Sequence, residues 1–394
     1  MLYTYSITPL SEHEFEARAQ DIITQVKRGT YLMPLFSMTL NPEGVPVWDK
    51  AGKMIKSYIR YRDRLARDGV DAGILIQASL GHSYPITKNP FQPYVNLTDG
   101  AEQPVCCPMD PAFVSHFSDV IRTLATARPK VLMLDDDFRL MMRRGKACAC
   151  PLHMAEFNRR AGVSMTREEL LAHISTHDKR DPLKRIFEQT QRDPLVEAAR
   201  AFRRIIDEID PTIQGANCTT GHLCESVIEI NQVFAGKGNP TMVRVPNGCY
   251  APLTTRTFSR GMSQAAICSS KLRKGGIEII LAETDTIPFN RYAKSARYLH
   301  AHFTSSILEG VSGAKHWLTR TSAFEPKSGV AYRDILAKHK GLYEKLTQLA
   351  PEIRWVGAAS AFLEQTEVDF NSPKNTRNHN HLWTKALLER IGLP

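Results

Sequence analysis

Short runs of apolar residues alternate with longer amphipathic stretches along the chain. Eight of the short runs are strand-like, because they are mostly apolar on both faces and are closed by Gly, Asn or Asp. They occupy residues 1–7, 30–38, 71–81, 130–136, 212–218, 241–247, 277–283 and 315–321. This pattern is typical of strands in a parallel sheet that is covered on both faces.

The stretches between these runs have the spacing of helices. The first, residues 11–29, begins with a Ser cap followed three residues later by Glu, and it ends in Gly. The others are residues 53–69, 110–129, 193–210, 222–238, 261–276, 295–310 and 332–351. Strands that alternate with helices predict a parallel sheet.

Eight such units predict a closed (β/α)8 TIM barrel of the α/β class. The alternative is an open, doubly wound sheet, but no Gly-rich phosphate loop follows any of the strands. We therefore expect residues 1–394 to form a single barrel, with a helical insertion around residues 160–200.

Composition narrows the class of protein. The chain of 394 residues is 42% hydrophobic and carries a net charge of +10, but its basic residues are interleaved with acids along the helices, so we expect no nucleic-acid partner. Neither a membrane span nor a signal peptide is evident, and we expect a cytoplasmic protein. Its eight cysteines are then reduced thiols, some of them metal ligands.

Candidate catalytic residues lie at the predicted strand ends, where barrels place their chemistry. Strand four ends in Asp135, Asp136 and Asp137, and strand seven ends in Glu283 on the opposite wall. Two facing carboxylates suit glycoside hydrolysis, in which one acid protonates the leaving oxygen and the other attacks or stabilises the oxocarbenium-like carbon. The alternative is that the aspartates cap a helix or pair with nearby arginines. Asp135 is also a candidate substrate-binding residue, together with Arg139, His82, Asn217, Asn247, Trp317 and Arg320.

A cysteine pattern follows strand four. Cys148 and Cys150 are two residues apart, His153 follows three residues later, and Cys106 and Cys107 lie upstream. Three thiolates and one imidazole make a closed tetrahedral zinc site, to which either Cys106 or Cys107 supplies the remaining ligand. Buried thiols without a metal are the alternative. The other four cysteines are scattered and are interpreted as core residues: Cys218, Cys224, Cys249 and Cys268.

A strand that ends in acids, followed by "CAC" and a further ligand position, resembles the catalytic barrel of family 42 glycoside hydrolases, which are retaining β-galactosidases of clan A. The resemblance implies that Glu283 is the nucleophile, that Asp137 is the acid/base and that Asp136 stands at the position of the family's Asn. It further implies a structural Zn²⁺ that is held by Cys106, Cys148, Cys150 and His153. It implies no organic cofactor.

The sequence departs from this family at strand four. Asp136 replaces the Asn that contacts the sugar 2-hydroxyl, and an aspartate at the acid/base position is one methylene shorter than glutamate. We therefore expect a divergent clan A relative that hydrolyses a β-galactoside-like or β-mannoside-like substrate through a covalent glycosyl-enzyme. By resemblance, the chain is compatible with the N-terminal domain of a longer protein that forms a homo-oligomer, namely a trimer.

Two other functions are left open by the sequence. One is a metal-dependent barrel (a lyase, aldolase or methyltransferase) in which the aspartates and His82 bind a catalytic divalent ion. The other is a carbohydrate-binding barrel without catalysis, which is suggested by the missing Asn-Glu pair.

Overall fold

A computed structural model describes seven segments of the chain: residues 1–82, 88–177, 180–220, 224–247, 255–286, 294–318 and 329–352. Among the residues singled out from the sequence, Arg320 and Cys249 lie outside these segments.

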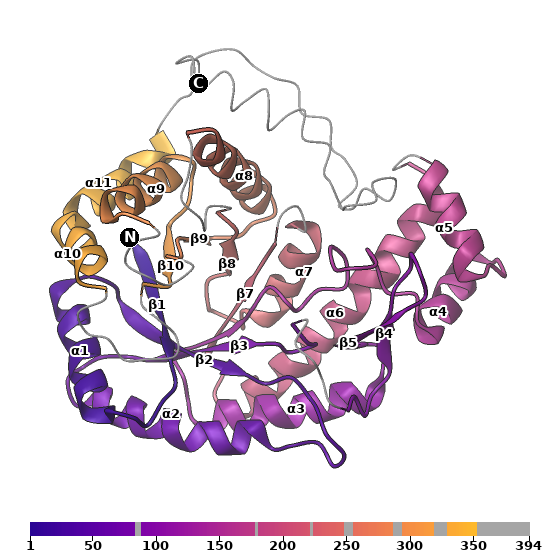
Figure 1. The fold of residues 1–394 in the computed structure, drawn as a ribbon, viewed down its shortest axis with the longest axis horizontal. Helices are drawn as coiled ribbons and strands as arrows, with labels where there is room; N and C mark the ends of the chain where they lie inside the picture. Colours follow the sequence, from indigo (N-terminus) through magenta and orange to yellow (C-terminus); the bar gives the residue numbers. More distant parts are fainter. Residues whose placement is uncertain are drawn as a thin grey trace.

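Eight parallel strands close into a barrel (Figure 1), which confirms the predicted fold. The barrel strands are β1 (Tyr3–Pro9), β2 (Met33–Thr39), β3 (Gly73–Gln77), β6 (Val131–Leu134), β7 (Gln214–Cys218), β8 (Met242–Val245), β9 (Ile279–Glu283) and β10 (Gly313–His316). Each pairs with the next barrel strand along the chain, and β10 pairs with β1 to close the ring. All eight predicted strands are present, although the last begins and ends earlier than residues 315–321.

The helices form a ring around the strands (Figure 1). The ring contains α1 (Phe15–Arg28), α2 (Lys50–Ala66), α3 (Pro111–Thr126), α6 (Pro182–Ile209), α7 (Cys224–Phe234), α8 (Thr255–Lys274), α9 (Ala296–Leu308), α10 (Val330–Lys338) and α11 (Lys340–Leu349). The predicted Ser cap of the first helix is wrong, because α1 starts after Glu14, which is left-handed and makes no side-chain cap. The last predicted helix is divided into α10 and α11 at His339.

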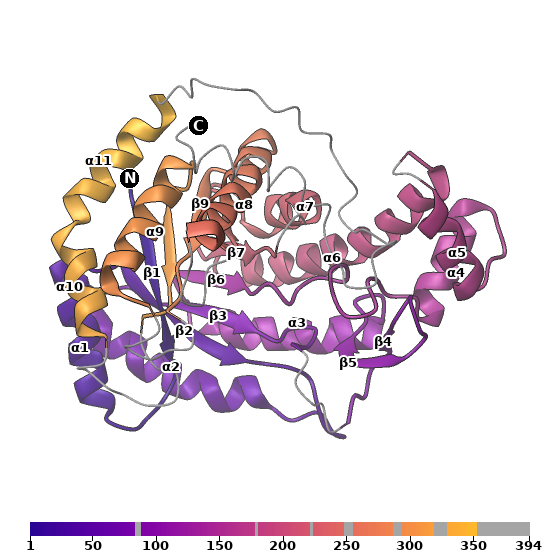
Figure 2. The same cartoon turned by 45° about the horizontal axis from the view of Figure 1, so that its top comes forward.

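Additional elements extend the barrel beside β3 and β6. A two-stranded antiparallel hairpin, β4 (Pro93–Val95) and β5 (Glu102–Cys106), follows β3. Two short helices, α4 (Pro151–Ala161) and α5 (Arg167–Thr176), precede the long α6. Figure 2 shows these elements on the side toward which β3 and β6 point, away from the centre of the barrel.

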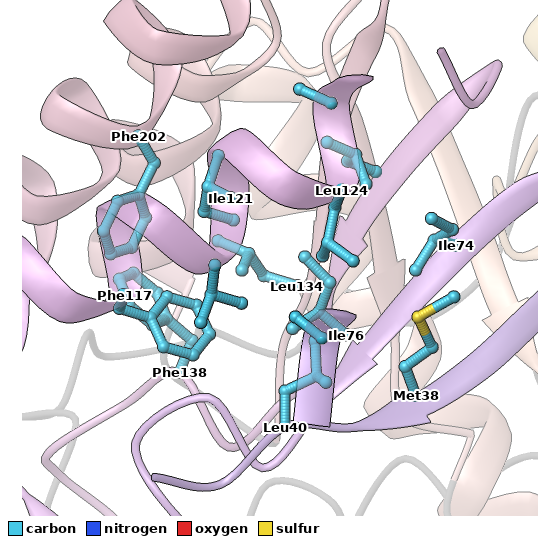
Figure 3. Close-up of a cluster of buried hydrophobic side chains, with 14 of the residues drawn as sticks. Met38, Leu40, Ile74, Ile76, Phe117, Ile121, Leu124, Leu134, Phe138 and Phe202 are labelled. Atoms are coloured by element: carbon cyan, nitrogen blue, oxygen red, sulfur yellow. The ribbon is translucent and has the colours of Figure 1, made fainter. Parts of the chain in front are cut away.

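Strand alternation separates two cores. One set of strand side chains fills the barrel interior, including Leu35, Leu75, Met133 and Leu281. The alternate set faces the helices: Figure 3 shows Ile76 and Leu134 packed toward Phe117 and Leu124 of α3 and Phe202 of α6. The position of a residue within a strand therefore decides whether its side chain points to the barrel axis or to the helical ring.

None of the helices in the described segments combines the length and the apolar character that crossing a membrane requires.

Truncating a side chain in the outer core should destabilise the protein. Leu124 is fully buried, and replacing such a leucine with alanine removes apolar contacts and leaves a cavity, so we expect Leu124→Ala to lower the free energy of unfolding by about 2–5 kcal/mol. The same substitution at Leu342, whose side chain is 42% exposed, is the matched control and should have a much smaller effect in urea unfolding. Equal losses for the two variants would contradict this packing.

Candidate functional site

Four charged side chains are buried together inside the barrel. The guanidinium of Arg244 bridges two carboxylates: one nitrogen lies 3.1 Å from Glu283 Oε2 and the other lies 3.1 Å from Asp135 Oδ1. Lys315 Nζ lies 3.9 Å from an oxygen of each carboxylate. The four side chains are only 2–7% exposed, so each charge is balanced by its neighbours rather than by water.

Strand alternation explains how these four residues meet. Met133, Met242 and Leu281 belong to the barrel interior. Arg244 and Glu283 lie two residues further along β8 and β9, Asp135 directly follows β6 in the same alternation, and Lys315 comes from β10, so all four point toward the axis near the strand ends. Sequence reasoning singled out the two acids but missed Arg244 and Lys315. A signal was available for Arg244, since it is a cation within the otherwise apolar strand β8.

Asp135 stays ionised in this setting. Burial alone would raise its pKa, but the neighbouring cations Lys315 and Arg244, together with a hydrogen bond from Gln77, bring the pKa of Asp135 below its ordinary value. Gln77 Nε2 donates to Asp135 Oδ2 at 3.1 Å, and Gln77 Oε1 in turn accepts from the hydroxyl of Ser37. Residues from β2, β3, β8 and β10 therefore fix the carboxylate at the end of β6.

The next two aspartates point in different directions. Asp136 has a partly exposed side chain, at 22%, and its Oδ1 lies 3.4 Å from Arg139 Nη1. Asp137 is fully buried, and its two oxygens accept hydrogen bonds from the backbone N–H of Ala78 at 2.9 Å and from the Ser79 hydroxyl at 3.0 Å. Burial, followed by the negative charge of Asp135, raises the pKa of Asp137 to about 7.

This geometry does not favour the acid/base role that the resemblance implied for Asp137. Both of its oxygens are engaged with the loop after β3, and none of its surface is exposed. The chain leaves β6 at Leu134, and beyond Asp135 strand alternation no longer governs where the side chains of Asp136 and Asp137 point. Asp136 is the one with a side chain accessible from solvent.

Glu283 has a second acid for a neighbour. Asp285 is almost fully buried, and burial followed by the negative charge of Glu283 raises the pKa of Asp285 to about 7. The Glu283 carboxylate thus lies between two cations, Arg244 and Lys315, and a second carboxyl that favours its protonated form.

Two asparagines that we expected to bind substrate face the helices instead. Asn217 Oδ1 accepts from Asn231 of α7 at 2.7 Å, because Ala216 and Cys218 are the inward-facing residues of β7. Asn247 is fully buried and donates to Ser306 of α9 at 2.7 Å. Both side chains therefore fall on the outer face of the barrel, away from Asp135 and Glu283.

The other predicted substrate-binding residues are placed as follows. Trp317 is half-buried and packs against the interior core just beyond β10. His82 is exposed in the loop after β3. The Arg139 guanidinium contacts two groups of Asp136, namely the carboxylate and the main-chain carbonyl oxygen.

A buried cluster of thiols and one imidazole lies between the end of β5 and the beginning of α4. Donor atoms of Cys107, Cys148, Cys150 and His153 all lie within 4.8 Å of one another. His153 Nδ1 is 3.3 Å from Cys107 Sγ and 3.2 Å from Cys150 Sγ, and these two sulfurs are 3.6 Å apart. A tetrahedral zinc site places its donor atoms about 3.5 Å apart, so these residues fit a metal ion.

The surrounding chain positions these ligands. Cys150 precedes α4 and His153 lies in its first turn, where the helix N-terminus favours thiolates. Gln191 of α6 fixes the Cys148 backbone, because it accepts from the N–H at 2.8 Å and donates to the carbonyl oxygen at 3.0 Å.

Cys106, the zinc ligand implied by the resemblance, is not part of the cluster. Its Sγ lies 3.4 Å from Asn89 Oδ1, and Cys107 takes its place among the donors. Adjacent residues at the end of β5 project in different directions, so only one of the pair can face α4. Of the two candidates that the sequence left open, Cys107 is the one that the fold brings to the other three donors.

No family model matches the sequence, and no curated protein matches it either. Solved structures do share its fold. A β-galactosidase from Bacillus circulans sp. alkalophilus has a TM-score of 0.57 at 13% identity, covering 88% of this chain and 56% of that chain. A GH42 β-galactosidase from G. stearothermophilus, solved as a catalytic mutant, has a TM-score of 0.55 at 10% identity, covering 89% and 57%.

An exo-β-1,4-mannosidase from Opitutaceae bacterium strain TAV5 has a TM-score of 0.55 at 12% identity, covering 100% of this chain and 68% of that one. The expected likeness to the family 42 barrel is confirmed at the level of the fold. The chain spans little more than half the length of these β-galactosidases.

Asp137→Asn should change how stability depends on pH. The pKa of Asp137 is about 7 in the folded protein against an ordinary 3.8, so the folded state binds this proton more tightly than the unfolded state does. The contribution of this proton to the free energy of unfolding is fully present below about pH 4. It is lost as the pH rises toward 7, by up to about 1.4 kcal/mol per pH unit. Urea unfolding from pH 4.5 to 7.5 should show the parent protein losing stability relative to Asp137→Asn. If the difference in the free energy of unfolding between the two proteins stays constant over this pH range, the raised pKa of Asp137 is contradicted.

Cys107→Ser should remove the buried metal, whereas Cys106→Ser should not. We expect about one equivalent of divalent metal in the parent protein and in Cys106→Ser, as measured by elemental analysis after purification without chelators. Cys107→Ser should contain much less metal and unfold at a lower temperature, because three buried donors would then lack their ion. Absence of metal from the parent protein, or loss of metal in Cys106→Ser, would refute this ligand set.

Proposed function

We propose that this chain is a retaining β-glycosidase that acts on a β-galactoside-like or β-mannoside-like substrate. The observation that carries the proposal is the position of Glu283, which ends β9 inside a closed eight-stranded barrel and shares Arg244 with Asp135, the first aspartate after β6. Support also comes from the fold, which is shared with β-galactosidases and an exo-β-1,4-mannosidase.

Glu283 is the nucleophile in this proposal. Arg244 and Lys315 contact its two oxygens and fix the carboxylate in one orientation. Asp135 shares both cations and holds them in place from the other side. Because Lys315 lies 3.9 Å from an oxygen of each acid, those two oxygens can be at most about 8 Å apart, so Asp135 belongs to the same buried charge cluster as the proposed nucleophile.

Asp136 is the acid/base that we propose in place of Asp137. Asp135 is unsuitable because its pKa is lowered by Lys315 and Arg244, and Asp137 is engaged on both oxygens. Asp136 is next to Asp135 and retains an accessible carboxyl group. Its short side chain restricts how far this proton donor can reach.

Two chemical steps follow from these roles. Asp136 protonates the glycosidic oxygen while Glu283 attacks the anomeric carbon, which gives a covalent glycosyl-enzyme. Asp136 then removes a proton from the water that displaces Glu283, and the configuration at the anomeric carbon is retained. Trp317, beside the inner core, would supply an apolar face for the sugar ring.

The buried cluster holds a structural zinc ion in this proposal. Three thiolates and one imidazole suit zinc, and a site closed by four protein ligands leaves no position for substrate. Cys107, Cys148, Cys150 and His153 would then tie the end of β5 to the beginning of α4. From the resemblance to family 42 glycoside hydrolases, we further propose that the protein assembles into a trimer.

A catalytic metal held by the aspartates is less well supported. Asp135 is already paired with Arg244 and Lys315, and His82 is exposed in its loop. Within the described segments, none of the three aspartates belongs to a group of donors close enough together to hold an ion.

Replacing the two proposed catalytic acids should have different effects. Glu283→Gln should abolish turnover of every nitrophenyl glycoside, because no glycosyl-enzyme can form. Asp136→Asn should still be glycosylated by activated aryl glycosides, whose leaving groups need no proton, but its deglycosylation should slow by about 10²–10⁴-fold. Added azide should restore turnover and release a β-glycosyl azide. Rates are measured on nitrophenyl β-galactoside, β-mannoside, β-glucoside, α-arabinoside and β-glucuronide.

Asp137→Asn is the matched control for Asp136→Asn. If Asp137→Asn shows the azide rescue and Asp136→Asn does not, the acid/base role belongs to Asp137. An α-anomer as the first product from a β-glycoside, seen by NMR, would contradict retention. Inactivity of the parent protein on the whole panel would favour a carbohydrate-binding barrel.

A further inference from the structure

We propose a second metal site, on the helical extension, formed by His173, His177 and Asp181. Donor atoms of the three residues lie within 4.8 Å of one another. Two imidazoles and a carboxylate suit a borderline divalent ion such as Zn²⁺ or Ni²⁺ better than Mg²⁺ or Ca²⁺. Figures 1 and 2 show α5 at the edge of the molecule, away from the barrel strands, so this site is separate from the glycosidase site.

The local sequence brings the donors together. His173 and His177 are four residues apart at the end of α5, so their side chains lie on one face. Their rings stack with centroids 3.9 Å apart and planes inclined by 14°, so binding one ion through both rings requires one of them to rotate out of the stack. Asp181 caps α6 by accepting from the Lys184 N–H at 2.8 Å. Asp181 Oδ1 is also 3.0 Å from His173 Nε2, which is close to the spacing of two donors on one ion.

Hydrogen bonding prepares His177 to act as a ligand. His177 Nδ1 lies 2.7 Å from the carbonyl oxygen of His173, so this nitrogen must carry the hydrogen. The lone pair of the neutral ring is then on Nε2. Metal-bound histidines commonly donate their other N–H to a carbonyl group in this way.

The backbone beneath the donors is also fixed. Lys184 Nζ lies 3.4 Å from the carbonyl oxygens of Ile174 and His177 at the end of α5. At the other end of this helix, Thr166 and Glu169 form a reciprocal capping box. His177 is exposed, and the side chains of His173 and Asp181 are 21% and 13% exposed, so an ion could enter and keep water as its remaining ligand.

The count of bound metal ions tests this site. Protein that retains its cysteine-site metal is equilibrated with micromolar Zn²⁺, and separately with Ni²⁺, and bound metal is measured by equilibrium dialysis. The parent protein should bind one equivalent more than the double variant His173→Ala/His177→Ala. The matched control is His300→Ala/His339→Ala, which removes another stacked pair, with centroids 4.2 Å apart, whose His300 Nδ1 contacts the Tyr343 hydroxyl rather than a carboxylate. This control should keep the additional equivalent.

A single variant guards against misfolding of the double variant. His177 is exposed, so His177→Gln should leave the fold intact and weaken binding of the additional ion at least tenfold. The same ion should raise the melting temperature of the parent protein and of the control but not of His173→Ala/His177→Ala. Equal uptake by the parent protein and His177→Gln would overturn the proposal and leave the 3.0 Å contact as a hydrogen bond only.

Discussion

The bridge that Arg244 makes between Asp135 and Glu283 constrains the rest of the barrel. Removing such charges from water costs several kcal/mol per ion, and the loss is offset only when opposite charges meet in a good geometry. Here the partners lie on or directly after β6, β8, β9 and β10, so the ion pairs require these strands to be assembled side by side in the curved sheet. The arrangement of this part of the barrel and the geometry of the candidate site therefore depend on one another. Loss of one partner would leave another charge buried without compensation.

Most of the barrel could be predicted from the sequence because its signals are local. Apolar runs, helical spacing and chain order determine eight strands and their ring, and they place Asp135 and Glu283 near the mouth. Arg244 was overlooked because its partners lie 109 and 39 residues away, and no local pattern reports a pairing between distant strands. Asn217 was misplaced because a strand end was treated as one position, although neighbouring side chains there point in opposite directions.

Details beyond the strand ends could be predicted least well. After Leu134 the chain turns, and Asp136 and Asp137 diverge according to hydrogen bonds that the loop after β3 supplies. Cys106 and Cys107 are a second example. Their spacing from Cys148 predicted that one of them is a metal ligand, but it could not distinguish between the two adjacent cysteines. In both cases the deciding information is the direction of one backbone segment relative to another that is distant in the sequence.

The pair of cations at the mouth has a consequence for a reaction cycle. In the resting protein two positive charges, on Arg244 and Lys315, face two negative charges, on Asp135 and Glu283. If Glu283 became an ester, it would lose its charge, and the cavity would hold one unbalanced positive charge. That excess would be balanced by the negative charge that Asp136 acquires when it gives up its proton to the leaving group, because the charge of Asp136 acts on Arg244. The first half of the reaction would then prepare the base that the second half needs, without any movement of the chain.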